Sequence, residues 1–164
     1  MMNNMTSMNV KMAAPQTVGA IMSQEPLMLA PKMRAREALV RLRQVGVPKD
    51  FMTNCYVVDE DYTLLGIITV RDLIMAQEST RLEQAMSKPV GVLSPRDDQE
   101  QAVALMDRLD LVELPVVDDD NHLVGTLTAE DAMDVLQAEA TEDMERMAAM
   151  APSERPYFQT KIWD

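Results

Sequence analysis

The chain has 164 residues and a formal net charge of −12 at pH 7, with one cysteine and one histidine. Binding to a nucleic-acid polymer needs clustered Lys and Arg, so this charge argues against that partner. A single cysteine allows no disulfide within the chain and fits a reducing, cytoplasmic setting. No stretch approaches the roughly 18 apolar residues of a membrane span. The acidic balance fits either small cations as partners or a plain soluble surface, and composition alone favours the surface.

The first 16 residues are rich in Met and Asn and lack the apolar core of a secretion signal, so we expect a flexible N-terminal arm. Residues 17–78 then show the pattern of one α/β unit, whose first long helix ends at Gly46. The predicted elements are an extended segment at 27–29, a helix reaching Val45, strands at 54–58 and 64–68, and a helix at 70–76.

Residues 79–137 repeat this order of elements. Ser94-Pro95-Arg96-Asp97 carries an N-cap residue, a proline in the first turn and an acid three residues on, which predicts that the long helix of this unit begins there. The other predicted elements are an extended segment at 90–93, strands at 111–117 and 122–127, and a helix from about residue 129.

The last helix is predicted to continue beyond the second unit. Residues 130–150 contain neither Gly nor Pro and are rich in strong helix formers, and at 1.5 Å per residue they would extend about 30 Å. We therefore expect residues 138–151 to form a connector. The tail at 152–164 holds three of the six aromatic residues beside a lysine, which is typical of a membrane–water boundary. It is either a juxtamembrane segment cut before a membrane span or a short tail packed on a dimer.

One motif occurs in both units, at positions 66–72 and 125–131, and reads Gly-x-x-Thr-x-x-Asp after Val-Val-Asp. Units of about 60 residues are marginal for a lone core, so the two should fold against each other. Thr and Asp at this spacing fit a helix capping box. They also fit a nucleotide site, because a helix N-terminus attracts phosphate and the Asp can accept hydrogen bonds from both ribose hydroxyls.

The paired motif resembles the cystathionine-β-synthase (CBS) domain, over residues 17 to 136. The resemblance implies an α/β (α+β) fold, a tandem pair of β-α-β-β-α repeats followed by a long helix, and a regulatory rather than an enzymatic role. No His/Cys/Ser constellation for nucleophilic catalysis is present. Carried over by position, Thr69, Arg71 and Asp72 would bind the phosphate and ribose of ATP or AMP in one cleft, and Thr128 and Asp131 would do so in the other. Glu130 replaces Arg71 there and would repel phosphate.

The closing helix is strongly acidic, with Arg146 as the single base between Glu130 and Met150. Like charges three or four residues apart destabilise an exposed helix by a few tenths of a kcal/mol per pair. The pattern is either a solvated face or a site for a hard divalent cation with oxygen ligands. Zn²⁺ does not fit, because the acids lack His or Cys partners.

The run Glu139–Met147, with Asp131-x-x-Asp134, is similar to the end of the CBS pair in MgtE-type magnesium channels. That resemblance implies a cytosolic homodimer at the face of the bacterial inner membrane, fused or docked to a membrane pore domain, that binds Mg²⁺ and is tuned by ATP. The acidic positions that match the family are Asp107, Asp110, Asp131, Asp134, Glu139, Glu142 and Asp143. The alternative is a nucleotide-sensing CBS module of another protein, or one that stands alone.

Overall fold

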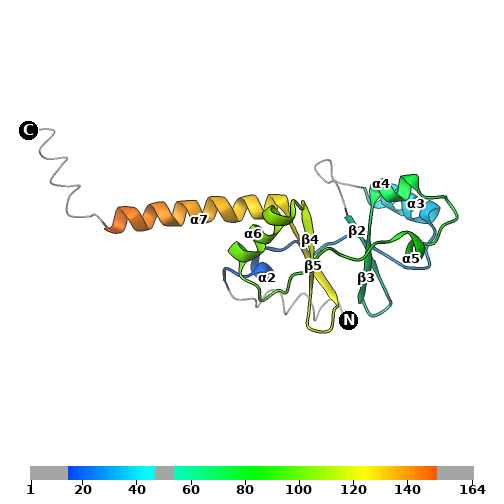
Figure 1. Ribbon diagram of the computed structural model, residues 1–164, viewed down its shortest axis with the longest axis horizontal. Helices are drawn as coiled ribbons and strands as arrows, with labels where there is room; N and C mark the ends of the chain where they lie inside the picture. The colour runs from blue at the N-terminus through cyan, green and yellow to red at the C-terminus, as the bar shows by residue number, and fades with distance from the viewer. Residues whose placement is uncertain (1–14, 47–53, 151–164) are drawn as a thin grey trace, which may run out of the picture.

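The computed structural model describes residues 15–46 and 54–150 and has two lobes, each with a small sheet and covering helices (Figure 1). The first lobe contains β1 (Met28–Leu29), α3 (Ala35–Val45), β2 (Asn54–Val58), β3 (Leu64–Thr69) and α4 (Val70–Met75). The second contains α6 (Gln99–Leu109), β4 (Glu113–Val117), β5 (Leu123–Thr128) and α7 (Ala129–Met150). The short helices α2 (Val18–Ile21) and α5 (Leu82–Ala85) lead into the two repeats. The predicted α/β pair with a long closing helix is confirmed.

The two sheets are built alike. β1 pairs in parallel with β2, and β2 pairs antiparallel with β3, while β4 pairs antiparallel with β5. The hairpins share one register, since Asn54 lies opposite Thr69 and Glu113 lies opposite Thr128. Leu93 forms a parallel bridge to β4, in the place that β1 takes on the first sheet. Each copy of the Thr-x-x-Asp motif therefore stands where a strand feeds directly into a helix.

The lead-in segments are exchanged between the lobes. Val18 and Met22 belong to the apolar core of the second lobe, whereas Leu82 belongs to that of the first. Ser23 forms a bridge to Thr126 of β5, and Ser87 forms the equivalent bridge to β3. Each repeat of the sequence therefore completes the core of the other, which makes the two lobes one cooperative unit.

This exchange explains the glycine of each motif copy. A Cβ on Gly125 would lie 2.6 Å from the backbone oxygen of Ser23 and 2.7 Å from the Sδ of Met22. A Cβ on Gly66 would lie 2.6 Å from the Sδ of Met86. The Met-Ser pair of each repeat thus lies against the bare backbone of the other repeat, where a side chain would clash.

A third apolar cluster joins the lobes at their hairpins. It consists of Tyr56, Val58, Leu64, Val117 and Leu123. The two β-turns lie side by side, since the Leu64 N–H donates to the Asn121 oxygen at 3.0 Å and the Leu123 N–H donates to the Tyr62 oxygen at 2.9 Å. The lobes are therefore joined by backbone hydrogen bonds as well as by apolar contacts.

The predicted start of the long helix in the second repeat is wrong. Helix α6 begins at Gln99, with Asp98 as the N-cap accepting from the Gln101 N–H at 3.0 Å. Residues 94–97 form a turn, in which the Asp97 carboxylate accepts from the Ser94 N–H at 2.8 Å. The carbonyls of Pro95 and Asp97 accept hydrogen bonds from the N-terminus of α2, so they are not available to a helix. The tertiary contact with α2 overrides the local capping signal.

The predicted start of the first strand in the second repeat is wrong by two residues. β4 begins at Glu113 rather than at Leu111, because the Leu111 N–H donates to the Met106 oxygen at 3.0 Å and so belongs to the end of α6. The predicted long helix is confirmed, with 22 residues in α7 and a distal half that projects away from the lobes (Figure 1). No helix within the described residues is long and apolar enough to cross a bilayer. The predicted tail at 152–164, and all but the last two residues of the predicted arm, lie outside the described part of the chain.

Candidate functional site

Both copies of the motif form capping boxes. The Oγ1 of Thr69 accepts from the Asp72 N–H at 3.1 Å, and the Asp72 carboxylate accepts from the Thr69 N–H at 3.2 Å. Thr128 and Asp131 make the same two bonds at 3.2 and 3.1 Å. These side chains therefore have a structural task at the helix starts, whatever else they bind.

The surroundings of the two motif copies differ. Asp72 and Arg71 are exposed, so a cationic side chain stands next to the first copy. In the second copy Thr128 is buried and Asp131 is half-buried, and the exposed neighbour is Glu130. A phosphate group would meet a positive charge at the first copy and a negative charge at the second.

A buried acid, Glu113, lies opposite Thr128 at the start of the second motif copy, and the sequence pattern did not indicate it. Glu113 is 6% exposed and accepts a hydrogen bond from the hydroxyl of the fully buried Tyr56 of the other lobe at 2.7 Å. Burial raises the pKa of Glu113 above its ordinary value, hydrogen bonds from the Tyr56 hydroxyl and the Asn54 backbone offset part of this, and the charge of Asp131 adds a smaller increase. Burial likewise raises the pKa of the neighbouring Cys55 thiol to about 12, so that thiol is inert.

The structure places the seven predicted cation ligands at several points of the second lobe. Asp131 is in the capping box, Asp110 is the left-handed C-cap of α6, and Asp134 is exposed on α7. Glu142 makes an ion pair with Arg146 at 2.6 Å. Asp107 and Glu139 line one groove between α6 and α7. Within the described residues of one chain, these carboxylates do not form a group of three that could hold a single ion.

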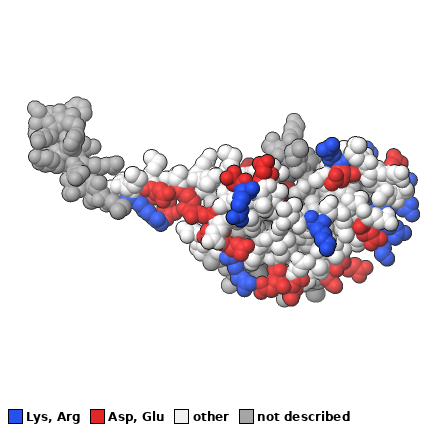
Figure 2. All heavy atoms as spheres, viewed as in Figure 1, with Lys and Arg blue, Asp and Glu red and all other residues white. Residues whose placement is uncertain are grey.

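Glu139 is nevertheless part of an acidic cluster that spans two helices. The Glu100 carboxyl at the start of α6 lies close to that of Glu139, and this proximity raises the pKa of Glu100, with smaller increases from the charges of Asp98 and Asp143. The Nε2 of Gln99 donates to the Oε1 of Glu139 at 2.9 Å. We call Asp98, Glu100, Glu139 and Asp143 the α6–α7 acidic cluster. Figure 2 shows acidic side chains along α7. Sequence reasoning found Glu139 and Asp143 but not Glu100, which is distant in sequence.

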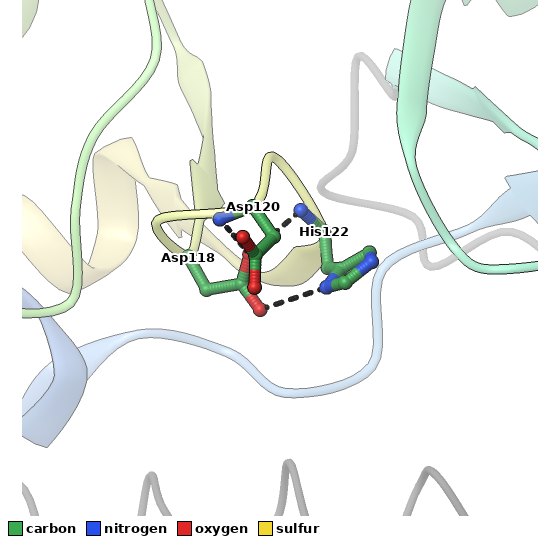
Figure 3. Close-up of side chains that lie close together, drawn as sticks. All are labelled: Asp118, Asp120 and His122. Atoms are coloured by element: carbon green, nitrogen blue, oxygen red, sulfur yellow. Dashed lines mark hydrogen bonds and ion pairs between the residues drawn. The ribbon is translucent and has the colours of Figure 1, made fainter.

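One other group of side chains has the donor set of a metal site. Asp118, Asp120 and His122, in the β4–β5 turn, place their ligand atoms within 4.8 Å of one another (Figure 3). Asp118 accepts from the N–H groups of the other two at 2.9 and 2.8 Å and contacts the His122 Nδ1 at 3.0 Å. Asp59 makes the same turn in the first lobe, with Thr63 in place of the histidine. The turn itself thus accounts for this geometry.

Two equivalent grooves lie beside the helices of the lobes. The one between α6 and α7 has a volume of about 560 Å³ and the one between α3 and α4 about 590 Å³. Large apolar side chains remain exposed around them, including Ile74 at 64%, Met133 at 61% and Leu136 at 58%. Apolar residues exposed at such levels on the same face of both lobes are typical of an interface.

The fold and the paired motif define a class of protein, a tandem α/β repeat with two equivalent helix starts. The CBS domain family matches residues 18–79 and 82–138, and this chain belongs to that family. The predicted family resemblance is thereby confirmed.

The relatives of the chain include magnesium transporters. The magnesium transporter MgtE of Thermus thermophilus is 38% identical over 132 residues, which are 80% of this chain and 29% of that protein. The soluble part of a magnesium transporter has a TM-score of 0.74 at 30% identity, over 81% of this chain and 52% of that one. The cytosolic domain of the Mg²⁺ channel MgtE in complex with ATP has a TM-score of 0.71 at 33% identity, over 77% and 51%.

Other relatives are enzymes that contain the same domain. The inosine-5′-monophosphate dehydrogenase of Methanocaldococcus jannaschii is 36% identical over 78 residues, which are 47% of this chain and 16% of that protein. The chain spans less than a third of the length of the curated magnesium transporters and dehydrogenases that it matches. What these whole proteins do is therefore a separate question from the fold of this chain.

Proposed function

We propose that this chain is the Mg²⁺-sensing regulatory module of an MgtE-like magnesium transporter or channel, and that it is not itself an enzyme. Divalent cations would draw acidic surfaces together and so control a membrane pore domain, fused to this segment or docked on it, at the cytoplasmic face of a bacterial inner membrane. The likeness to MgtE proteins over 80% of the chain supports this. So does α7, whose length beyond the lobes suits a connector.

The observation that carries the proposal is the contact between Glu100 and Glu139 in the α6–α7 acidic cluster. Two ionised carboxylates close together repel each other, and the raised pKa of Glu100 reflects the nearby Glu139 carboxylate. A hard dication with a preference for carboxylate oxygens, placed between them, can turn this repulsion into attraction.

The remaining predicted ligands belong to the same proposal. Asp107 stands on the rim of the α6–α7 groove with Glu139, and Asp110, Asp131, Asp134, Glu142 and Asp143 carry further negative charge on the same lobe. Carboxylates that are too far apart to share an ion within one chain can do so between two chains. Mg²⁺ keeps several waters and needs only one or two carboxylates from each side.

The chain is proposed to act as a homodimer. The α3–α4 and α6–α7 grooves lie at equivalent places in the two lobes, and exposed apolar residues such as Ile74 and Met133 border them. A two-fold interface uses the same patch on both copies, which suits a module with internal symmetry of this kind. Acidic α7 helices brought near each other by the dimer would then need a cation between them.

ATP or AMP is the second proposed ligand. Thr69, Arg71 and Asp72 would hold it at the first motif copy, and Thr128 and Asp131 are the equivalent residues of the second. The complex of a similar MgtE domain with ATP supports this proposal. The nucleotide would adjust the response to Mg²⁺ only if it prefers one of the two states of the dimer.

Thermal unfolding with and without Mg²⁺, at constant high monovalent salt, tests the proposal. Ligand binding to the folded state stabilises it by RT ln(1 + [L]/Kd), so millimolar Mg²⁺ should raise the melting temperature clearly. Glu139→Gln should reduce the shift. The control is Glu37→Gln, an exposed glutamate in the first turn of α3 in the other lobe, which should respond to Mg²⁺ as the wild type does. An identical melting curve with chelator and with Mg²⁺ would refute the proposal.

The alternative function is a nucleotide-sensing CBS module of another protein, or a stand-alone one. The match of part of the chain to inosine-5′-monophosphate dehydrogenase supports this alternative. This alternative predicts ATP or AMP binding that depends on Asp72, with no specific effect of Mg²⁺. Separate calorimetric titrations with MgCl₂ and with nucleotide distinguish the two functions.

A further inference from the structure

The residue that faces the motif threonine across the hairpin differs between the two lobes. In the first lobe Asn54 pairs with Thr69, and in the second lobe Glu113 pairs with Thr128. The registers are equivalent, so these two positions are structural counterparts. The strand residue opposite the motif threonine is therefore a neutral amide in the first lobe and an acid in the second.

Glu113 is held firmly in this position. It is 6% exposed, and the hydroxyl of Tyr56, which is fully buried in the lobe junction, donates to its Oε1 at 2.7 Å. Within the described residues, none of the ion pairs involves it, so no base neutralises it. Glu113 lies opposite Thr128 in the hairpin, so its buried carboxyl stands beside the second motif copy, and the charge of Asp131 also acts on it.

The start of α7 differs from the first copy in the charge beside it. The capping bonds are alike, since the Asp131 N–H donates to the Thr128 hydroxyl at 3.2 Å and the Asp72 N–H donates to the Thr69 hydroxyl at 3.1 Å. The exposed residue at the start of α7 is Glu130, where the first copy has Arg71. Two acids, Glu113 and Glu130, thus stand beside the second copy.

We infer that Glu113 determines the ligand preference of the second motif copy: its carboxyl, fixed by Tyr56 and reinforced by Glu130, excludes phosphate-bearing nucleotides from that copy. Nucleotide then binds only at the first copy, through Thr69, Arg71 and Asp72, and this part rests on the proposed function. A phosphate brought to the second copy would face the negative charges of Glu113 and Glu130 with no base beside them, in a partly buried setting where charges are weakly screened.

ATP is the probe, and equilibrium dialysis gives its stoichiometry. The wild type should bind no more than one ATP per chain, and Asp131→Asn should change neither the stoichiometry nor the affinity by more than about twofold. Asp72→Asn should weaken binding by roughly tenfold or more, the worth of a charged hydrogen bond. Loss of a bound ATP in Asp131→Asn would overturn the inference.

The double variant Glu113→Gln/Glu130→Arg should bind one ATP more per chain than the wild type, and adding Asp131→Asn should abolish that gain. The side-chain amide oxygen introduced by Glu113→Gln can still accept from the Tyr56 hydroxyl, so the junction is kept. The matched control is Glu37→Gln/Glu83→Arg, with the same change in net charge at exposed positions away from the motif, which should bind as the wild type does. A double variant that gains no ATP overturns the inference.

If the wild type binds no ATP, the nucleotide part of the proposed function fails, while a gain in the double variant still supports the role of Glu113.

Discussion

At Gly125 the backbone of the other repeat comes close to the glycine, which is not the case at Gly66. An added Cβ would meet the backbone oxygen of Ser23 at 2.6 Å, whereas at Gly66 the closest atom is the Sδ of the flexible Met86 side chain. We predict that Gly125→Ala destabilises the chain by about 1–3 kcal/mol, the range for overpacking, and that Gly66→Ala costs less. Urea unfolding of both variants checks this. Equal losses, or the reverse order, would contradict the exchanged packing.

The buried pair of Tyr56 and Glu113 predicts a dependence of stability on pH. Burial raises the pKa of Glu113 in the folded state above that in the unfolded chain. The stabilisation is then fully present below the unfolded pKa and is lost as pH rises through the folded pKa. Glu113→Gln has no proton to lose, so its stability relative to wild type should increase with pH across that window. Unfolding free energies at several pH values, with Tyr56→Phe as a second variant that loses about 1–3 kcal/mol, measure this. A constant difference between Glu113→Gln and wild type would show that the acid is not strained.

At the scale of elements, helix α6 shows how a tertiary contact selects among capping signals. Asp98 caps the helix, while Ser94 belongs to the preceding turn. Asp98→Ala should cost about 1 kcal/mol, the usual worth of an N-cap, and Ser94→Ala should cost less than half of that. Chemical denaturation gives the free energy of unfolding of the two variants and so tests this prediction. A larger loss at Ser94 would mean that the helix begins where the sequence alone places it.

The elements that could be predicted are those in which local pattern and tertiary contact agree. The hairpins and α7 follow from alternation, the acidic turns and an uninterrupted run of helix formers. The start of α6 could not be predicted, because the carbonyls of Pro95 and Asp97 are engaged by α2, which is distant in sequence. The exchange of Met22 and Met86 between lobes is equally invisible, since the two repeats read alike.

The same distinction applies to the candidate site. The Thr-x-x-Asp copies repeat in sequence and fit either a capping box or a nucleotide site. The structure confirms the capping boxes, and the nucleotide site stays a prediction. Glu100 and Glu113 were missed, because their importance comes from contacts with Glu139 and Tyr56 rather than from a motif. A charged residue at the first position of an otherwise apolar strand was the one signal that could have drawn attention to Glu113.

At the scale of the whole molecule, a net charge of −12 is carried by a two-lobed body with an acidic projecting helix (Figure 2). The two exchanged cores hold the lobes together as one body. A ligand moves such an equilibrium only by its preference for one state, and a shift from 1:99 to 99:1 requires about 5.5 kcal/mol. Several Mg²⁺ ions shared between acidic surfaces would meet that requirement.

Small-angle X-ray scattering with chelator and with millimolar Mg²⁺, at equal ionic strength, tests this most directly. We predict a smaller radius of gyration for the dimer in Mg²⁺, and a much weaker change in the variant Glu100→Gln/Glu139→Gln. The same scattering profile under both conditions would contradict the account.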